Sequence, residues 1–575
     1  MSLNYNPDDS LIDAISVAVL LSERDVAGQI PINFVTTPAV SLRAACFGNN
    51  VFEPQSFGKC LSNLLDVGYR RLVVDLYWSA ERRRWIFCPV SVPANGGHAA
   101  RSNVSTSNGG APLIQLGPYS CSDDLDVMSM ISVLQGFFQH TNAQFNVYTT
   151  YIIFNLHVAA SDSAPDQPPP NLSGDHFPTT SLGYILDSSL DQYIYKPSQL
   201  AEERSNLNES WYKVDDNYKP IVQYFTLHES SDGTQSTPDG WPCSKYVQLA
   251  KQRRLLFGYG NIASQLGGFS VAYEDEIMFP PNYLASREDV DVSNNGTLVS
   301  GCLYNPGATD VSQANSSWAV SSRIPIPNTP PTEDILQQLS TMVTNLTSCG
   351  LSPFLNTTLL DRTADADINI YRNISLSSSW AWAKGEPHDA NGPAGEDGKN
   401  RCAMMDLTLG GHWRAANCTH VRHTACRVNN MPFTWVLSNT TSSYFDAPTA
   451  CPDDTDFDVP RTGLENTYLF EYVMSQSKDI IDTSSLDPAK REIWLNFNSL
   501  HIASCWVTDG PEADCPYASD PQKLERRIVL VSTIAGIVIC IVAALMLFVK
   551  CNANRRNSRR RRKVIEGWEY EGVPS

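Results

Sequence analysis

The sequence predicts an α/β fold in which strands and helices alternate over about 300 residues to form a layered sheet or barrel. Two short, nearly continuous apolar runs, Arg71–Tyr77 and Tyr151–Val158, are typical of buried parallel strands. Helical patterns lie between and after them, at Phe57–Leu65, Ser129–Phe138 and Lys245–Lys251. A long uncharged run near the C-terminus adds one membrane-spanning helix to this region.

The uncharged run, Ile528–Val549, has 22 residues and contains no Pro, Asn or Gln. A helix of this length reaches about 33 Å at about 1.5 Å per residue, enough to cross a hydrocarbon core of about 30 Å. A helix buried in a soluble core is the alternative, but such helices are seldom apolar on every face over this length. The sequence therefore predicts one transmembrane helix at residues 528–549.

The charges on either side of this run predict its orientation. Residues 550–575 hold eight basic and three acidic residues, a net charge of +5, and the −19 of the whole chain leaves −24 for residues 1–549. Basic residues resist translocation, so we expect the tail in the cytosol and the acidic part in the lumen or outside the cell. This is a single-pass type I topology. The arginine-rich run 555–563 could instead be a nuclear localisation signal or a nucleic-acid patch.

Glycosylation sequons and cysteines agree with this orientation. Of the 15 cysteines, 13 precede the span; we expect disulfides, and because 13 is odd, at least one of these thiols is free or pairs elsewhere. The N-terminus is acidic where a secretory signal is basic, which leaves an atypical signal or an incorrect start as alternatives. The sequons all precede the tail and predict N-glycosylation at Asn103, Asn171, Asn208, Asn295, Asn315, Asn345, Asn356, Asn373, Asn417 and Asn439.

Composition divides the chain into several domains. The run IPIPNTPPT at Ile324–Thr332 indicates a linker, and a helical pattern follows it at Asp334–Thr347. Strand-like runs within Ile493–Trp506 could complete the barrel, in which case the module before them would be an insertion. We expect an N-terminal segment at 1–30, a barrel at 31–325, a second module at 340–430, a β-rich membrane-proximal region at 431–527, the span at 528–549 and the tail at 550–575.

The order of segments from Pro31 to about Ile262 resembles the phosphatidylinositol phospholipase C-like phosphodiesterases, a TIM-barrel family. The likeness rests on LLDVGYRRLVVDLYW (Leu64–Trp78), YIYKPSQL (Tyr193–Leu200) and WPCSKYVQLAKQRRLLFGYG (Trp241–Gly260). This resemblance implies a TIM barrel in which Asp75 and Arg70 remain at family-like positions of the barrel mouth.

That family cleaves phosphodiesters with two histidines, because the attacking and the leaving oxygen each need a proton moved. The segment Pro31–Leu42, where the first histidine is expected, has none, and the segment expected to hold the second has Cys88. We therefore expect a degenerate barrel without catalysis, in which Asp75 and Arg70 form a structural ion pair. A phosphodiesterase or glycan hydrolase with a rearranged active site is the alternative.

Residues Trp380–Arg427 resemble the second half of a C-type lectin-like domain, which has an α+β fold. This likeness implies a disulfide between Cys402 and Cys418, and another between Cys426 and Cys349. Separately, Cys505 and Cys515 bracket a short turn and could pair. The likeness rests on Trp382, Gly385-Glu386-Pro387, Cys402, Met404, Gly411, Trp413, Cys418 and Cys426.

The lectin-like segment lacks the residues that hold calcium in sugar-binding lectins. Such lectins use the oxygen ligands of Glu-Pro-Asn and Trp-Asn-Asp triplets, whereas this chain has Glu386-Pro387-His388 and Trp413-Arg414-Ala415. The three histidines around Cys418 have spacings that fit no helix face, and the run Asp454–Asp458 lacks the Gly and distal Glu of a calcium loop. We expect no metal site and no cofactor.

Segments along nearly the whole chain are similar to a fungal family, the maintenance of telomere capping protein 6 family. They include RDVAGQIPINFVTTP, SSSWAWAKGEP, NRCAMMDL and RTGLENTYL, followed by the apolar run and the arginine tail. The resemblance implies a single-pass type I membrane glycoprotein with a part in telomere capping and no known reaction. Because DNA binding needs a basic surface and residues 1–549 carry −24, we expect no direct nucleic-acid binding. We expect an indirect role through a protein or glycan ligand.

Overall fold

The computed structural model of the 575-residue chain describes residues 3–93, 112–169, 171–172, 181–267, 276–293, 297–324, 333–388, 400–517, 545–546, 562–565 and 568–571. The chain forms two compact units, residues 1–513 and 514–575. In the second unit, β22 (Arg562–Ile565) and β23 (Trp568–Glu571) form an antiparallel pair. Except for Leu545 and Met546, the predicted span lies outside the described residues. Among the helices that are described, none has the length and apolar character to cross a membrane.

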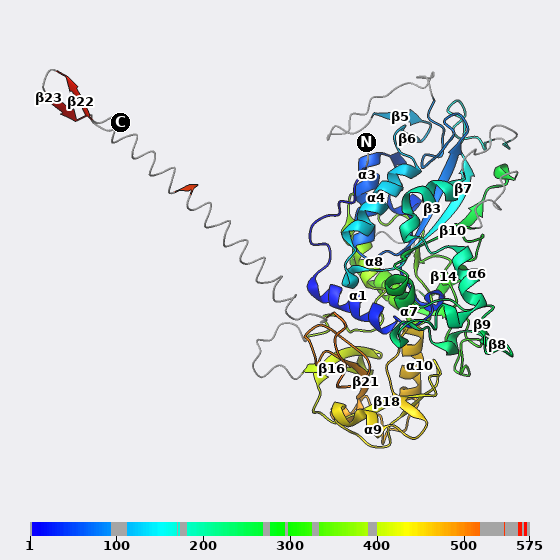
Figure 1. Ribbon diagram of the computed structural model, residues 1–575, viewed down its shortest axis with the longest axis vertical. Coiled ribbons are helices and arrows are strands. Elements are labelled where there is room, and N and C mark those ends of the chain that lie inside the picture. Colours follow the sequence, from blue (N-terminus) through cyan, green and yellow to red (C-terminus); the bar gives the residue numbers. More distant parts are fainter. Residues whose placement is uncertain are drawn as a thin grey trace. The chain divides into compact units, whose positions relative to one another are not determined.

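A parallel sheet in the order β10–β7–β3–β1–β15 forms the centre of the first unit (Figure 1). Each neighbouring pair in this order is parallel. The strands β3 and β7 coincide with the two predicted apolar runs to within two residues. The bounds are β1 (Ala39–Ser41), β3 (Arg71–Ser79), β7 (Thr150–Val158), β10 (Leu255–Ile262) and β15 (Phe354–Leu355), with β4 (Arg84–Ile86) antiparallel to β3.

Short pairings extend this sheet toward a closed barrel. Phe279 forms a parallel bridge to Gly258 of β10. Farther along the chain, β11 (Ser286–Glu288) pairs in parallel with β14 (Ala319–Ser321), and Val320 of β14 bridges to Ser352, just before β15. The strands therefore curve back toward β15 with interruptions, which makes the fold a partial TIM barrel.

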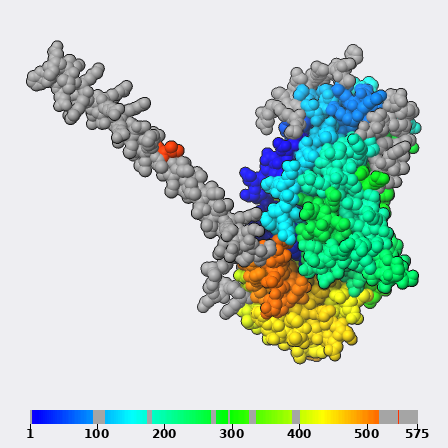
Figure 2. All heavy atoms as spheres, in the orientation of Figure 1, coloured from blue at the N-terminus to red at the C-terminus, as the bar shows by residue number. Residues whose placement is uncertain are grey.

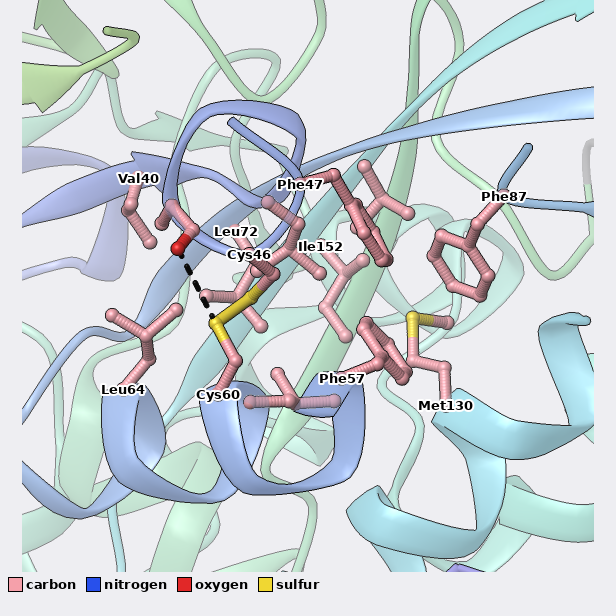
Figure 3. Packing of buried hydrophobic residues seen from close by; sticks show 14 of the residues in the cluster. Val40, Cys46, Phe47, Phe57, Cys60, Leu64, Leu72, Phe87, Met130 and Ile152 are labelled. Atoms are coloured by element: carbon pink, nitrogen blue, oxygen red, sulfur yellow. Dashed lines mark hydrogen bonds between the residues drawn. A yellow bond between two sulfur atoms is a disulfide. The ribbon is translucent and has the colours of Figure 1, made fainter. Parts of the chain in front are cut away.

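The two faces of the sheet follow the alternation expected of β-strands. Val40, Leu72 and Ile152 belong to the larger apolar cluster, between the sheet and the helices outside it (Figure 3). The alternate positions, such as Val73 and Ile153, belong to a second apolar cluster in the barrel interior. The larger cluster also contains the disulfide between Cys46 and Cys60, which ties the start of the barrel to α3 (Figure 3).

The outer helices have the apolar periodicity that the sequence predicts. In α3 (Pro54–Asp66) the buried Phe57, Leu61 and Leu64 recur at helical spacing, and Pro54 occupies the first turn, where its missing N–H leaves no donor unpaired. The other helices are α1 (Ala14–Val26), α2 (Leu42–Ala45), α4 (Val127–His140), α5 (Leu182–Leu190), α6 (Pro197–Ser205), α7 (Glu333–Ser348), α8 (Ile368–Leu376), α9 (Ala447–Ala450) and α10 (Gly463–Met474).

Short strands also lie at the periphery of the barrel. They are β2 (Val51–Phe52), β5 (Leu113–Leu116), β6 (Tyr119–Ser122), β8 (His228–Glu229), β9 (Gln235–Ser236), β12 (Asp291–Val292) and β13 (Leu298–Ser300). The predicted helix Lys245–Lys251 is a single turn of π-helix, Tyr246–Ala250.

A second sheet follows the barrel in the chain, in the order β17–β16–β21–β18–β19, with β20 paired to β18. Here β21 lies between β16, to which it is antiparallel, and β18, to which it is parallel. The strand at Ile493 therefore completes this sheet, and the expectation that it completes the barrel is wrong. The strands are β16 (Asn400–Asp406), β17 (His412–Asn417), β18 (His423–Val428), β19 (Trp435–Leu437), β20 (Thr455–Phe457) and β21 (Glu492–Asn498).

The boundary predicted at Ile324–Thr332 is also wrong. The segment after it supplies α7, β15 and α8 to the barrel, because β15 pairs with β1 through Phe354 and Leu355. A two-residue strand carries no periodicity, so nothing in the sequence indicated β15 beyond the predicted boundary. The barrel therefore extends beyond 325, into the region expected to start the lectin-like module.

Helix α1 joins the two parts of the first unit. Its N-cap Asp13 accepts a hydrogen bond from the Ser16 N–H, and near its C-terminus Ser22 accepts one from Trp382 Nε1 at 2.8 Å. Val26 packs in the apolar cluster of the second sheet. The segment expected to act as a signal is thus integrated into the fold. Figure 2 shows the residues after 400, in yellow and orange, against the end of the barrel.

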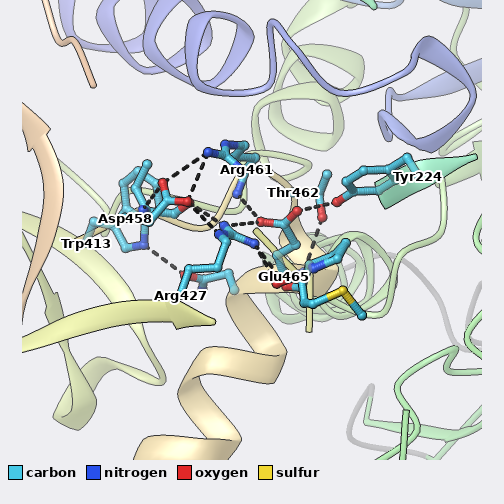
Figure 4. Close-up of polar contacts among 11 residues, drawn as sticks. Tyr224, Trp413, Arg427, Asp458, Arg461, Thr462 and Glu465 are labelled. Atoms are coloured by element: carbon cyan, nitrogen blue, oxygen red, sulfur yellow. Dashed lines mark hydrogen bonds and ion pairs between the residues drawn. The ribbon is translucent and has the colours of Figure 1, made fainter. Parts of the chain in front are cut away.

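A buried network of charges lies at the same junction (Figure 4). Arg427 of β18 contacts Asp458 and Glu465, at 2.6 Å and 2.7 Å. The hydroxyl of Tyr224, from the barrel part of the chain, donates a hydrogen bond to Glu465. We call Arg427, Asp458, Arg461 and Glu465 the junction network.

Candidate functional site

Four side chains of β3 and β7 form a polar cluster inside the carboxyl end of the barrel. The parallel register pairs Asp75 with Asn155 and Tyr77 with His157. These positions alternate with outward-facing residues and continue the inward-facing row of Val73 and Ile153. We call Asp75, Tyr77, Asn155 and His157 the mouth cluster. In TIM barrels the active site lies at this end of the strands.

Asp75 is the hydrogen-bond acceptor at the centre of the mouth cluster. Its Oδ1 accepts a hydrogen bond from Asn155 Nδ2 at 2.9 Å and lies 3.2 Å from His157 Nε2. Burial opposes ionisation of Asp75, but the hydrogen bonds from His157 and Asn155 outweigh it and lower its pKa. The imidazole also stacks on the Tyr77 ring, with centroids 4.9 Å apart. His157 is therefore held on two sides.

The neighbouring strand β10 fixes Asn155 as well. The N–H of Asn261 donates to Asn155 Oδ1 at 2.8 Å. A Cβ atom at Gly260 would lie 2.4 Å from the same oxygen, so a side chain there would displace the amide. The amide group of Asn155 thus bridges Asp75 and β10, with both of its ends occupied.

The mouth cluster supplies one imidazole and one carboxylate. A His–Asp pair can orient a general base, but phosphodiester cleavage by acid–base catalysis needs a second group to protonate the leaving oxygen. His157 is the one histidine on the parallel sheet, whose strands are all described. Cys88, from the segment expected to hold a second histidine, forms a disulfide with Cys121. The sequence interpretation overlooked His157, although Asn155 and His157 alternate along a strand that it identified.

Arg70 lies at the opposite end of the barrel, so the expected ion pair with Asp75 does not form. Arg70 directly precedes β3, whereas Asp75 lies five residues along, a distance of about 16 Å at about 3.3 Å per residue. The Arg70 guanidinium donates to the carbonyl of Leu65 at 2.5 Å and to that of Tyr69 at 3.2 Å. Asp75 and Arg70 therefore belong to separate sites.

In the lectin-like segment an arginine occupies the position between two carboxylates. Arg414 lies 3.5 Å from Glu386 and 3.2 Å from Asp406, and Glu386 also accepts hydrogen bonds from the N–H groups of His388 and Ala415. The Glu386 carboxylate is thus paired with a cation of the chain itself.

The disulfides match the sequence interpretation in part. The structure joins Cys402 to Cys418, the pair that the lectin resemblance implies. It joins Cys426 to Cys451 and Cys349 to Cys302, so the expected Cys349–Cys426 pair is wrong. The reason is that Cys349 follows α7 and lies in the barrel, next to the loop of Cys302, and not in the second sheet.

The remaining cysteines among the described residues are Cys243, Cys505 and Cys515. Cys505 and Cys515 are both disulfide-bonded. Cys243 is a free, buried thiol, and burial raises its pKa to about 12. An unpaired thiol among the 13 cysteines before residue 528 agrees with their odd number.

A partial parallel barrel whose sheet strands carry one histidine, followed by a disulfide-linked β module, defines the class of protein as a partial TIM barrel with an additional β domain. The family model of the MTC6 partial TIM-barrel domain matches residues 12–380. The chain belongs to this family.

Several relatives share the name maintenance of telomere capping protein 6. The protein from Lachancea thermotolerans is 24% identical over 578 residues, covering 97% of this chain and 94% of the relative. The Candida albicans protein is 24% identical over 624 residues, covering 99% and 95%. One from Saccharomyces cerevisiae is 27% identical over 470 residues, covering 78% and 75%. No solved structure matches the chain.

Proposed function

We propose that this chain is a single-pass type I membrane glycoprotein whose folded part binds a protein or glycan ligand outside the cytosol, without catalysing a reaction. The observation that carries the proposal is the mouth cluster. Its single imidazole is held by Asp75 and Tyr77, and Cys88 is sequestered in a disulfide. Within the described residues the mouth cluster offers no second imidazole for an acid–base reaction with two proton transfers.

Disulfides support a folded part outside the cytosol, because such bonds persist in oxidising compartments. Sequon exposure supports glycosylation, because a glycan needs an accessible asparagine. Of the eight sequon asparagines that the structure describes, Asn345 and Asn417 are half-buried. The other six are exposed: Asn171, Asn208, Asn315, Asn356, Asn373 and Asn439.

The apolar run at 528–549 and the tail charge of +5 support the proposed anchor and its orientation. This topology makes the connection to telomere capping, which the relatives' names suggest, an indirect one. A surface that neutralises DNA phosphates must be basic, whereas residues 1–549 carry −24. The lectin-like segment is proposed as part of the ligand-binding surface.

Topology is tested with sealed membrane vesicles that contain the full chain with an epitope after Ser575. We expect endoglycosidase to lower its apparent mass, and added protease to remove the epitope while sparing the folded part. Removal of the folded part in intact vesicles, with no mass shift, would overturn the proposed orientation. Replacing Asn356 and Asn439 with Gln provides the control, because the mass shift should shrink by two glycans.

A second candidate function is a hydrolase with a rearranged site, and the 3.2 Å contact between His157 and Asp75 is the observation that favours it. The two are separated by assaying the full chain on inositol phospholipids and glycosylphosphatidylinositol substrates. We expect no turnover. Turnover that disappears in both Asp75→Asn and His157→Gln, and persists in Asp232→Asn at an exposed loop, would establish the hydrolase instead.

A further inference from the structure

A cavity of about 460 Å³ lies at the amino-terminal end of the barrel strands, opposite the mouth cluster. The residues that directly precede three strands line it: Pro38 before β1, Arg70 before β3 and Thr149 before β7. Helix α1 covers it and contributes Leu20 and Glu23 to its wall. The volume is within the range of small-molecule sites, about 300–1,000 Å³.

The wall of this cavity is largely aromatic and aliphatic near Arg70. The Arg70 guanidinium carbon lies 4.9 Å from the Tyr148 ring centroid and 5.4 Å from that of Phe137. Tyr148, Phe137 and Leu20 all line the cavity. Cation–π contacts of this kind stabilise a guanidinium, but they do not neutralise its charge.

Arg70 is half-buried, and no carboxylate among the described residues lies within ion-pair distance of its guanidinium. Its Nη1 donates to two backbone carbonyls and its Nε is fully covered, whereas its Nη2 makes no hydrogen bond to the described residues. Asp66 interacts electrostatically with Arg70 without forming an ion pair. The Oδ1 of Asp66 accepts a hydrogen bond from the Tyr5 hydroxyl, and burial raises the pKa of Asp66. Buried charges are ordinarily paired, so this end of the cavity is complementary to an anion.

Carboxyl groups also line the cavity: Asp9, Asp66, Glu23 and Asp8, which is paired with Lys59. Glu23 Oε1 accepts hydrogen bonds from the N–H groups of Trp380 and Ala381, each at 2.9 Å. Burial raises the pKa of Glu23 to about 8, so this carboxyl is mostly protonated at neutral pH. Thr37 also lines the cavity, and its covered hydroxyl has no hydrogen-bond partner among the described residues.

We propose that this cavity binds a small amphipathic anion, with its carboxylate against Arg70 and its apolar body against Phe137, Tyr148 and Leu20. One guanidinium with a free donor fits one carboxylate, and the aromatic wall fits a short hydrocarbon or aromatic body. The site is separate from the mouth cluster and goes beyond the ligand binding proposed above, so its test is independent of topology and of turnover.

The test is isothermal titration calorimetry on the full chain in phosphatidylcholine nanodiscs with 4-phenylbutyrate and its neutral amide, 4-phenylbutyramide. These two probes differ only in the charged group. We expect saturable one-to-one binding of the carboxylate, with an affinity about ten- to hundredfold higher than that of the amide. This is the gain in affinity that a charge-assisted hydrogen bond provides over a neutral one. Equal affinities, or no binding of either probe, would overturn the proposal.

Variants then locate the binding. Arg70→Met should abolish the preference for the carboxylate, whereas Arg287→Met, at an exposed arginine, should leave it unchanged. Leu20→Trp fills the cavity without altering Arg70 and should remove binding of both probes. A preference that survives Arg70→Met, or undiminished binding in Leu20→Trp, would overturn the proposal. Thermal unfolding identifies a variant that fails to fold. If Arg70→Met or Leu20→Trp is lost in this way, the remaining variant and the comparison of the two probes on the unaltered chain test the proposal.

Discussion

Replacing Glu465 with Gln removes a buried negative charge from the junction network (Figure 4). The side chains of Arg427 and Glu465 are 1% and 0% exposed, and Arg427 Nη2 lies 2.7 Å from Glu465 Oε2. Burial alone would lower the pKa of Arg427, but Glu465 and Asp458 raise it above its ordinary value. The arginine is therefore charged and depends on both carboxylates.

Loss of one partner of a buried ion pair destabilises a protein by about 3–5 kcal/mol, because the remaining charge stays desolvated. In Glu465→Gln, Asp458 still contacts Arg427 at 2.6 Å, and the amide oxygen can accept one hydrogen bond. We therefore expect the lower end, a loss of about 3 kcal/mol in the free energy of unfolding. The variant also weakens the contact of Tyr224 with this network, so the two parts of the first unit should separate more readily.

The assay is urea unfolding of the full chain in nanodiscs, followed by tryptophan fluorescence. Glu209→Gln is the matched control, because Glu209 pairs with Lys213 at the surface, where the two side chains are 65% and 64% exposed. An exposed pair contributes about 0–1 kcal/mol, so the control should unfold nearly as the unaltered chain does. A loss in Glu465→Gln no larger than that in Glu209→Gln would refute the reasoning that the network stabilises the junction.

Three further predictions concern other parts of the first unit. Burial raises the pKa of Glu23 from 4.5 to about 8, so folding takes up a proton and stability falls as pH rises between those values. The Tm of Glu23→Gln should lose this part of the pH dependence. A Tm that falls with pH in Glu23→Gln as steeply as in the unaltered chain would contradict this. Replacing Cys302 and Cys349 with Ser opens a loop with a sequence separation of 47 and should cost about 2–5 kcal/mol in urea unfolding; an unchanged midpoint would contradict this. A Cβ at Gly463 would lie 2.5 Å from a backbone oxygen of α7, so Gly463→Ala should destabilise by about 1–3 kcal/mol in the same assay, whereas Gly307→Ala, whose nearest atom is at 3.7 Å, should not.

The central strands and several helices could be predicted because each carries its own periodicity. The run Tyr151–Val158 became β7 with one residue added, and the pattern Asp334–Thr347 became α7 with one residue added at each end. Both are long enough for burial to select apolar residues at regular spacing. β15 could not be predicted, because two residues, Phe354 and Leu355, carry no period and acquire their role only by pairing with β1. That omission placed the end of the barrel too early.

The candidate site was predictable from one strand and not from the other. Asp75 interrupts the apolar run Arg71–Tyr77, and the phospholipase C-like resemblance implied its place at the barrel mouth. Asn155 and His157 show the same signal, two polar residues alternating with apolar ones at the carboxyl end of a strand. The resemblance implied that Arg70 lies beside Asp75 at the barrel mouth, which is wrong because a strand separates residues five apart by about 16 Å.

The two ends of the barrel differ in how their polar groups are satisfied. At the carboxyl end, Asp75, Asn155 and His157 contact one another and β10, so the side chains that would act on a substrate are hydrogen-bonded among themselves. At the amino-terminal end, Arg70 lines a cavity and has no ion-pair partner among the described residues. Since unsatisfied buried groups are costly, the second end has more to gain from a ligand. We therefore expect binding of small molecules at the end where TIM-barrel enzymes do not place their active sites.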